Sequence, residues 1–494
     1  MKSLITLTLV VLLSTLSLQA QNLNEQIKLL DDFIIEGIDK WQPPGLAVTV
    51  VKDDKIVFKK AYGVRTIGTN KKVDENTLFG CMSTTKAFVS AGLAMLVDDG
   101  KLHWDDKVID HLPDFQLKDA YITRELTIRD LLTHRSGLGN TDYLWSMMTI
   151  SGDSAYHKLR EVEKSYSLRS SFIYQNLMYH TAGKVIEALS GMSWGEFLDE
   201  RIYSPLGMND TYPLMSSISD IENKADAHYE IDGDILKIEQ MSVDTAGAAG
   251  SMWSSISDIG KWVQFLLNEG RIEQDTLIQT STFKELFKPQ QIIPAGQFYP
   301  TQQITKPNWM TYGLGWFQHD YNGKMVQFHT GSLPGMIAIV GLIPEDNIGV
   351  YVMGNLDHVE LRHAIMYTTF DLFTEGRSSR NWSDELYPIY HPEKEEQKEQ
   401  ETISGAEPTF EIEELIGTFE DEQLGWVKIT QNEGGLTFNM NNTVYGKLSH
   451  RHYDTYQGIF NRKYWGETTF NFVRGPNGKL SHVDFFGERF IVKD

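Results

Sequence analysis

A short stretch, Phe79–Phe88, places a serine and a lysine three residues apart in front of a long apolar run. That run, Ala87–Val97, predicts a buried helix. Ser83 lies where the helix would begin and Lys86 follows it, so both side chains should project from one face. A serine needs a nearby base to become a nucleophile, and a lysine serves only if burial or neighbours lower its pKa. The stretch therefore predicts a nucleophile and its base at a helix start, where free N–H groups suit a developing oxyanion.

The spacing alone is weak evidence, because the chain contains it a second time. Ser281 and Lys284 stand in the same relation, but no apolar run follows them and the next residues are charged. We interpret this second match as a solvated helix face. The first match needs support from other parts of the chain.

Composition limits the classes of partner and cofactor. The net charge of −22 argues against nucleic acid or an anionic membrane as a partner. The single cysteine, Cys81, excludes an intramolecular disulfide, and we expect it to be a small packed side chain. His450 and His452 alternate on one expected strand with no further ligand nearby, which favours packing over metal binding. We expect neither a metal nor a cofactor.

The chain begins with one positive charge, an apolar run over Leu4–Leu18 and a small residue at Ala20. This pattern is typical of a secretory signal peptide, here residues 1–20, and the run is short for a membrane span. We expect export to the periplasm or the exterior, with no membrane insertion after cleavage.

Residues 21–375 read as one α+β domain: an antiparallel sheet flanked by helices, with a helical lobe. A helix over Asn24–Trp41 precedes a hairpin, and four strands and a helix end the domain. The expected strands are Gly45–Val51, Lys55–Tyr62, Tyr312–Phe317, Lys324–Thr330, Met336–Ile343 and Ile348–Met353, with the last helix over Asp357–Phe373. Between them, Gly139–Ser171 is polar and irregular, and we expect a loop or small subdomain over the site mouth.

A change of composition divides the rest of the chain. Residues 376–409 are rich in Glu, Lys, Gln and Ser with several prolines, which predicts a charged linker. Residues 410–494 contain about eight short β-rich runs separated by turns, which predicts a small antiparallel barrel.

Two further motifs fall where the chemistry would need them. Tyr174-x-Asn176 precedes an apolar helical segment, and a phenol and an amide at this spacing can enter one cavity. His329-Thr330-Gly331-Ser332 closes an expected strand. A fourth candidate, His134, is better interpreted as a histidine that bonds loop backbone below the site.

Taken together, the three motifs resemble the serine β-lactamase and penicillin-binding protein superfamily, in its class C and D-Ala-D-Ala carboxypeptidase-like branch. Supporting segments are Leu131–Leu138, Pro205–Met208 and Tyr312–Trp316, and the similarity runs from about Ile34 to about Leu372. The C-terminal segment, including Ser449–Asp454, is similar to the lipocalin-like domain appended to some serine peptidases of this branch.

The resemblance implies a role for each matched position. Ser83 would form the acyl-enzyme, while Lys86 and Tyr174 would handle its proton as a coupled pair whose resting base the sequence leaves open. Asn176 would orient the substrate amide. The remaining substrate-binding positions are His329, Thr330, Gly331 and Ser332, and the N–H groups of Ser83 and Ser332 would form the oxyanion hole.

His329 departs from the family pattern, which usually has lysine there. A histidine with an ordinary pKa of about 6.5 is mostly neutral at pH 7, so a preference for anionic substrates should weaken. His329 either shapes the pocket or is a packed strand-end residue. We therefore expect an exported serine hydrolase acting on an amide or ester bond of a small molecule or peptide, a peptidase or esterase with D-stereospecificity as an option.

Two alternatives remain from the sequence. One is a β-lactamase or D-Ala-D-Ala carboxypeptidase, and the other is a non-catalytic secreted protein that binds or senses acyl groups. For the barrel, a cap, a substrate gate or a homo-oligomer contact are the candidate roles.

Overall fold

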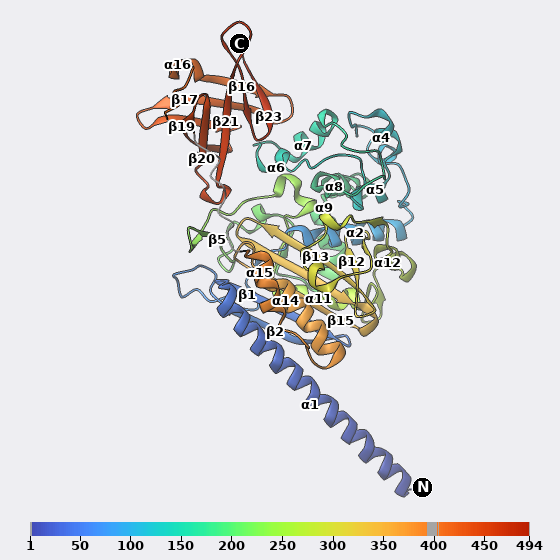
Figure 1. The fold of residues 1–494 in the computed structure, drawn as a ribbon. Coiled ribbons are helices and arrows are strands. Elements are labelled where there is room, and N and C mark those ends of the chain that lie inside the picture. Colours follow the sequence, from blue (N-terminus) through green and yellow to red (C-terminus); the bar gives the residue numbers. More distant parts are fainter. Residues whose placement is uncertain (1, 393–402, 404, 494) are drawn as a thin grey trace.

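The computed structural model describes residues 2–392, 403 and 405–493 (Figure 1). Its centre is an eight-stranded antiparallel sheet in the order β10-β11-β12-β13-β14-β15-β1-β2, so early strands pair with late ones. The strands are β1 (Gly45–Lys52), β2 (Lys55–Gly63), β10 (Gln291–Ile292), β11 (Met310–Tyr312), β12 (Phe317–Tyr321), β13 (Lys324–Leu333), β14 (Met336–Ile343) and β15 (Ile348–Gly354).

Helices cover both faces of this sheet, because its central strands are apolar on both sides. In β1, Leu46, Val48 and Val50 pack into one core while Ala47 and Val51 pack into the other. The first core lies under α1 (Lys2–Trp41), α14 (Leu361–Phe370) and α15 (Trp382–Tyr390). The second lies under α2 (Thr85–Asp98), α8 (Asn176–Ser190) and α11 (Ile256–Leu267).

A helical lobe and short hairpins complete this domain, which confirms the predicted α+β architecture. The remaining helices are α3 (Val108–His111), α4 (Ala120–Glu125), α5 (Ile128–Leu132), α6 (Tyr143–Ser146), α7 (Gly152–Lys158), α9 (Trp194–Leu198), α10 (Ser204–Leu206), α12 (Thr280–Leu286) and α13 (Gln302–Thr305). The short strands are β3 (Phe79–Gly80), β4 (Thr211–Tyr212), β5 (His228–Ile231), β6 (Asp234–Lys237), β7 (Trp253–Ser254), β8 (Arg271–Ile272) and β9 (Asp275–Thr276).

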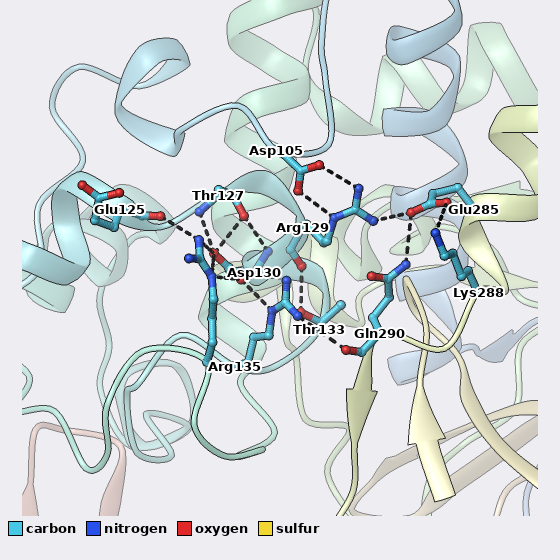
Figure 2. Close-up of polar contacts among 11 residues, drawn as sticks. Asp105, Glu125, Thr127, Arg129, Asp130, Thr133, Arg135, Glu285, Lys288 and Gln290 are labelled. Atoms are coloured by element: carbon cyan, nitrogen blue, oxygen red, sulfur yellow. Dashed lines mark hydrogen bonds and ion pairs between the residues drawn. The ribbon is translucent and has the colours of Figure 1, made fainter.

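A buried carboxylate ties the lobe together (Figure 2). Asp130 in α5 is fully buried and accepts from Arg135 Nε at 2.6 Å and from Arg169 Nη2 at 2.7 Å. Burial raises the pKa of Asp130, but the two arginines outweigh it and hold that pKa below its usual value. Nearby, Arg129 donates to Glu285 of α12 at 2.5 Å. The pair between Asp130 and Arg169 fixes the segment that leads into the Tyr-x-Asn motif.

The C-terminal segment is a closed antiparallel barrel, which confirms the predicted small barrel. After the short helix α16 (Ile412–Leu415) its eight strands follow in chain order. They are β16 (Gly417–Asp421), β17 (Gly425–Asn432), β18 (Gly435–Met440), β19 (Val444–His452), β20 (Thr455–Phe460), β21 (Glu467–Arg474), β22 (Leu480–Phe485) and β23 (Glu488–Val492). Aromatic side chains fill its interior, for example Phe470 stacked on Phe485 at 4.0 Å between ring centroids.

The barrel contacts the larger domain through α6 and the residues after it (Figure 1). Tyr143 and Met147 pack against the barrel core. Asn441 Nδ2 donates to the carbonyl oxygen of Met147 at 3.2 Å, and the hydroxyls of Thr149 and Thr443 lie 2.7 Å apart. Part of the segment expected as a loop over the site mouth is thus held by the barrel.

Three sequence expectations differ from the structure in detail. The strand expected over Tyr312–Phe317 is instead the connection between β11 and β12, where Gly315 has a φ of +91° that an extended strand does not accept. The segment Gly139–Ser171 is not wholly irregular, because α6 and α7 form within it. Residues 376–409, expected to be a linker, contain α15.

Helix α15 forms because its local signals outweigh the charged composition around it. The side chain of Asn381 caps it by accepting from the Asp384 N–H at 3.2 Å. Trp382 is fully buried and stacks on Tyr367 at 4.5 Å. Within the expected linker, residues 393–402 and 404 lie outside the described residues.

At the N-terminus, the expected signal peptide falls on the first half of α1, with residue 1 outside the described residues. Export stays a prediction. Among the helices that the structure describes, none is long and apolar enough to cross a membrane.

Candidate active site

Ser83 lies in a single 3-10 turn, η1 (Met82–Thr84), that runs directly into α2. Its side chain is partly exposed, whereas Lys86 one turn later is fully buried. Met82 has a φ of +46°, a conformation that a residue with a long side chain rarely adopts and that costs energy. The strained turn aims Ser83 at the Lys86 side chain, and Lys86 Nζ lies 3.0 Å from Ser83 Oγ.

Lys86 is held by two further partners on different elements. Its Nζ donates to Asn176 Oδ1 at 2.7 Å, at the start of α8, and to the carbonyl oxygen of Ala249 at 2.7 Å. Burial lowers the pKa of Lys86 to about 7, against the opposing charge of Asp142. A lysine with this pKa is about half neutral at pH 7, so it can accept the proton of the Ser83 hydroxyl.

Tyr174 enters the site from the segment before α8. Lys86 Nζ lies 4.8 Å from the centre of its ring. Its hydroxyl is shielded from solvent and has no hydrogen-bond partner in the described part of the chain. Burial raises the pKa of Tyr174 well above its ordinary value, with the Ser83 hydroxyl opposing that rise. Tyr174 is therefore a neutral phenol at pH 7.

His134 supports Tyr174 from below, which confirms its interpretation as a residue that bonds loop backbone. Its Nδ1 accepts from the N–H of Gln175 at 3.0 Å, and its ring lies 4.2 Å from the Tyr174 ring. Burial lowers the pKa of His134 well below 6.5, so it stays neutral.

Strand β13 brings the third motif against the Ser83 turn. Gly331 is required there, because a Cβ atom would lie 2.3 Å from the carbonyl oxygen of Cys81 and 3.1 Å from the Ser83 nitrogen. Thr330 and Ser332 line the cavity beside Ser83. Cys81 itself is buried, and burial raises the pKa of its thiol to about 12.

His329 does not line the cavity. It is 1 % exposed, its Nδ1 donates to the carbonyl oxygen of Thr330 at 2.7 Å, and its Nε2 accepts from the Tyr312 hydroxyl at 2.8 Å. Burial and the charge of Lys86 lower the pKa of His329 to about 3. The histidine is neutral with both ring nitrogens occupied, which is the packed strand-end arrangement.

The cavity above Ser83 has a volume of about 610 Å³. Its wall combines aromatic side chains with about as many polar ones, a lining that can orient a small ligand. The lining residues are Ser83, Asp142, Trp145, Phe172, Tyr174, Asn176, Gln297, Phe298, Tyr299, Pro300, Phe317, Thr330, Ser332, Leu333, Pro334 and Arg362.

The sequence did not predict a place in the cavity for three of these lining residues, Asp142, Tyr299 and Arg362. The Arg362 guanidinium donates to Gly331 O at 2.6 Å and Ser332 Oγ at 2.9 Å and pairs with Glu360 at 2.8 Å, so it braces the end of β13. A charged residue inside the apolar run of α14 was the available signal. Asp142 gave none, because it precedes a helix of four residues.

Among the residues that the structure describes, no cluster of three or more His, Cys, Asp or Glu side chains could hold a metal ion.

The chain belongs to the beta-lactamase family, because the family model described as "Beta-lactamase" matches residues 30–369. The barrel matches a second family, "Domain of unknown function (DUF3471)", over residues 401–493. Its relation to lipocalins stays a prediction.

Several relatives align with about two thirds of this chain. The unguisins hydrolase ungD of Aspergillus violaceofuscus is 28% identical over 67% of this chain and 62% of its own length. Protein flp of Staphylococcus aureus strain MW2 is 27% identical over 68% of this chain and 64% of its own length. The chain thus spans less than two thirds of the length of these relatives.

Solved structures share the fold. The octameric penicillin-binding protein homologue from Pyrococcus abyssi aligns with a TM-score of 0.63 at 20% identity, over 94% of this chain and all of that one. The D-amino acid amidase from Ochrobactrum anthropi SV3, complexed with D-phenylalanine, aligns with a TM-score of 0.57 at 24% identity, over 72% of this chain and 98% of that one.

The contact of Gly331 with the Ser83 turn predicts that Gly331→Ala slows the reaction of Ser83. The added Cβ must displace backbone, and a shift of this size beside a nucleophile costs roughly a hundredfold in rate. The measurement is the labelling rate of Ser83 by a fluorophosphonate probe. Gly417→Ala, where a Cβ meets nothing within 4 Å, is the matched control. Equal labelling of both variants would contradict the contact.

Proposed function

We propose that this protein is an exported serine hydrolase that cleaves an amide or ester bond through an acyl-enzyme on Ser83. The observation that carries the proposal is the buried Lys86, whose Nζ lies 3.0 Å from Ser83 Oγ and whose pKa burial lowers to about 7. A neutral lysine next to a partly exposed serine at a helix start is a nucleophile with its base in place.

In this mechanism Lys86 is the resting base, because Tyr174 is neutral and holds its proton. Ser83 Oγ attacks the substrate carbonyl carbon while its proton passes to Lys86. The N–H groups of Ser83 and Ser332 stabilise the resulting oxyanion. The proton then reaches the leaving group through Lys86 or the Tyr174 hydroxyl as the scissile bond breaks. A water molecule hydrolyses the ester on Ser83 by the same proton path in reverse.

The charges of the cavity favour substrates without an essential carboxylate. His329 is neutral below the cavity wall, and the charge of Arg362 is compensated by Glu360 at 2.8 Å. This supports a peptidase or esterase over a β-lactamase or D-Ala-D-Ala carboxypeptidase. The similarity to the unguisins hydrolase and to the D-amino acid amidase supports amide hydrolysis, including that of D-amino acid derivatives.

Hydrolysis of a small substrate panel tests this proposal. The panel is a p-nitrophenyl ester, a D-amino-acid amide, a D-Ala-D-Ala peptide and a chromogenic cephalosporin. We expect turnover of the ester and the amide, with a loss of at least a thousandfold in Ser83→Ala. Ser281→Ala removes the serine of the second Ser-x-x-Lys match, on the exposed side of α12, and should retain full activity. Turnover that survives Ser83→Ala would refute the nucleophile, and a stable adduct without turnover would favour the non-catalytic binding protein.

The pKa of Lys86 predicts an acidic limb in the rate profile. Because the lysine must be neutral to accept a proton, kcat/KM should rise with pH through about 7 and then level off. The other titratable groups around Lys86 do not explain such a limb: the pKa values of His134 and His329 lie well below it, and those of Tyr174 and Tyr179 well above. Lys284→Gln should leave the profile unchanged. A limb near pH 4 would exclude Lys86 as the base.

We further propose that the barrel mediates self-association. Tyr445 and Ile459 lie on its adjacent strands β19 and β20 and are 50% and 45% exposed. A penicillin-binding protein homologue of this fold is octameric, which supports assembly in principle. Light scattering of the purified protein should give a mass above 56.4 kDa that falls to the monomer mass in Tyr445→Lys/Ile459→Lys. A monomeric parent protein would refute this role.

A further inference from the structure

Asp142 is the only carboxylate among the residues that line the cavity above Ser83. It lies immediately before α6 and is partly exposed. Its Oδ1 accepts from Asn176 Nδ2 at 2.9 Å and from Trp145 Nε1 at 2.9 Å. Its Oδ2 has one contact, Asn140 Nδ2 at 3.3 Å. All of these partners are neutral, so in the described part of the chain Asp142 has no cation at ion-pair distance.

A carboxylate in a cavity wall without a cationic partner is expensive to desolvate, and a bound cation would offset that cost. The indole of Trp145 beside it adds an aromatic surface that also attracts cations. The two cationic side chains of the cavity region are already committed. Arg362 is paired with Glu360, and Lys86 is half neutral at pH 7 with its Nζ bonded to Ser83, Asn176 and Ala249.

We propose that Asp142 and Trp145 form a subsite for a substrate ammonium group, so that the preferred substrates are amides or esters of amino acids with a free α-amine. This inference rests on the proposed function and specifies its substrate class. An α-amine is two bonds from the carbonyl carbon that Ser83 attacks. Asn176 lies between Lys86 and Asp142. Its Oδ1 accepts from Lys86 Nζ at 2.7 Å, and its Nδ2 donates to Asp142 Oδ1 at 2.9 Å.

The same arrangement couples substrate binding to the base. The negative charge of Asp142 raises the pKa of Lys86 against the effect of burial. A bound ammonium neutralises that charge, so the pKa of Lys86 falls and more of it is neutral when the substrate is in place. Amines thus bind and activate in one step, whereas an N-acylated substrate leaves Lys86 as it is in the free enzyme.

Asp142→Asn tests the subsite, since it keeps the acceptor for Asn176 and Trp145 and removes the charge, together with the long contact to Asn140 at 3.3 Å. The substrates are the p-nitroanilides of D- and L-alanine and their N-acetyl forms. We expect the preference for the free amine, as a ratio of kcat/KM values, to fall at least about tenfold in the variant, the usual loss for a hydrogen bond between charged groups. Asp153→Asn, an exposed acid of α7 paired with Lys184, is the matched control and should keep the ratio.

A second readout separates charge from structure. Loss of the Asp142 charge should shift the acidic limb of kcat/KM to lower pH, because Lys86 loses the group that raises its pKa. Asp421, Glu161 and Glu488, whose charges add to the effect of burial in raising the pKa of the neighbouring Tyr143, stay in place in this variant. An equal fall in rate for both substrate types with an unmoved limb would overturn the subsite and leave Asp142 as a support for Asn176.

Binding without turnover keeps this inference separate from the proposed function. Calorimetry with phenylalanine amide, in both enantiomers, compares Ser83→Ala with Ser83→Ala/Asp142→Asn. We expect binding to the first that is at least about tenfold weaker in the second. If the amide binds through Asp142 but the parent protein hydrolyses nothing, the proposed function fails and the subsite stands. If both variants bind the amide equally, the subsite fails whatever the activity.

Discussion

The burial of Lys86 is the constraint on which the site depends. An ammonium group taken out of water must be given three acceptors or lose its proton, and this lysine has both options. Its three partners come from the Ser83 turn, the start of α8 and the loop before β7. Each of these elements is held by the packing of α2 and α8 over the sheet. The core therefore does more than stabilise the domain, because it sets the proton affinity of one amine.

Around this lysine the remaining groups are kept neutral by the same means. Tyr174, His134 and His329 all lose water on folding, and in each case burial moves the pKa away from pH 7 in the direction of the uncharged form. A site in which one group titrates near neutrality and its neighbours do not can move a proton without competing equilibria. Strain contributes as well, since the left-handed Met82 presents the serine and Gly331 lets β13 approach it.

Much of this arrangement could be predicted from the sequence where the signal is local. Ser83 and Lys86 are one helical turn apart, and Tyr174 and Asn176 precede an apolar helix, so their geometry follows from short-range rules. The antiparallel strands, the barrel and the backbone-bonding role of His134 were predictable from similar local signals, whereas the pairing of β1 with β15 was not, because it joins distant parts of the chain. Asp142 and Arg362 were not, because each acquires its position from contacts with residues far along the chain. Helix α15 was hidden by the charged residues after it, and Gly315 breaks what the apolar residues around it indicated as a strand.

The hydrogen bond between Asn441 and Met147 joins residues 294 positions apart. The contacts of Lys86 all lie within the larger domain, yet the segment that carries Asp142 and Trp145 is packed against the barrel through Tyr143 and Met147. One wall of the cavity therefore rests on a second folded unit. A substitution inside the barrel would reach this wall without touching any residue around Ser83.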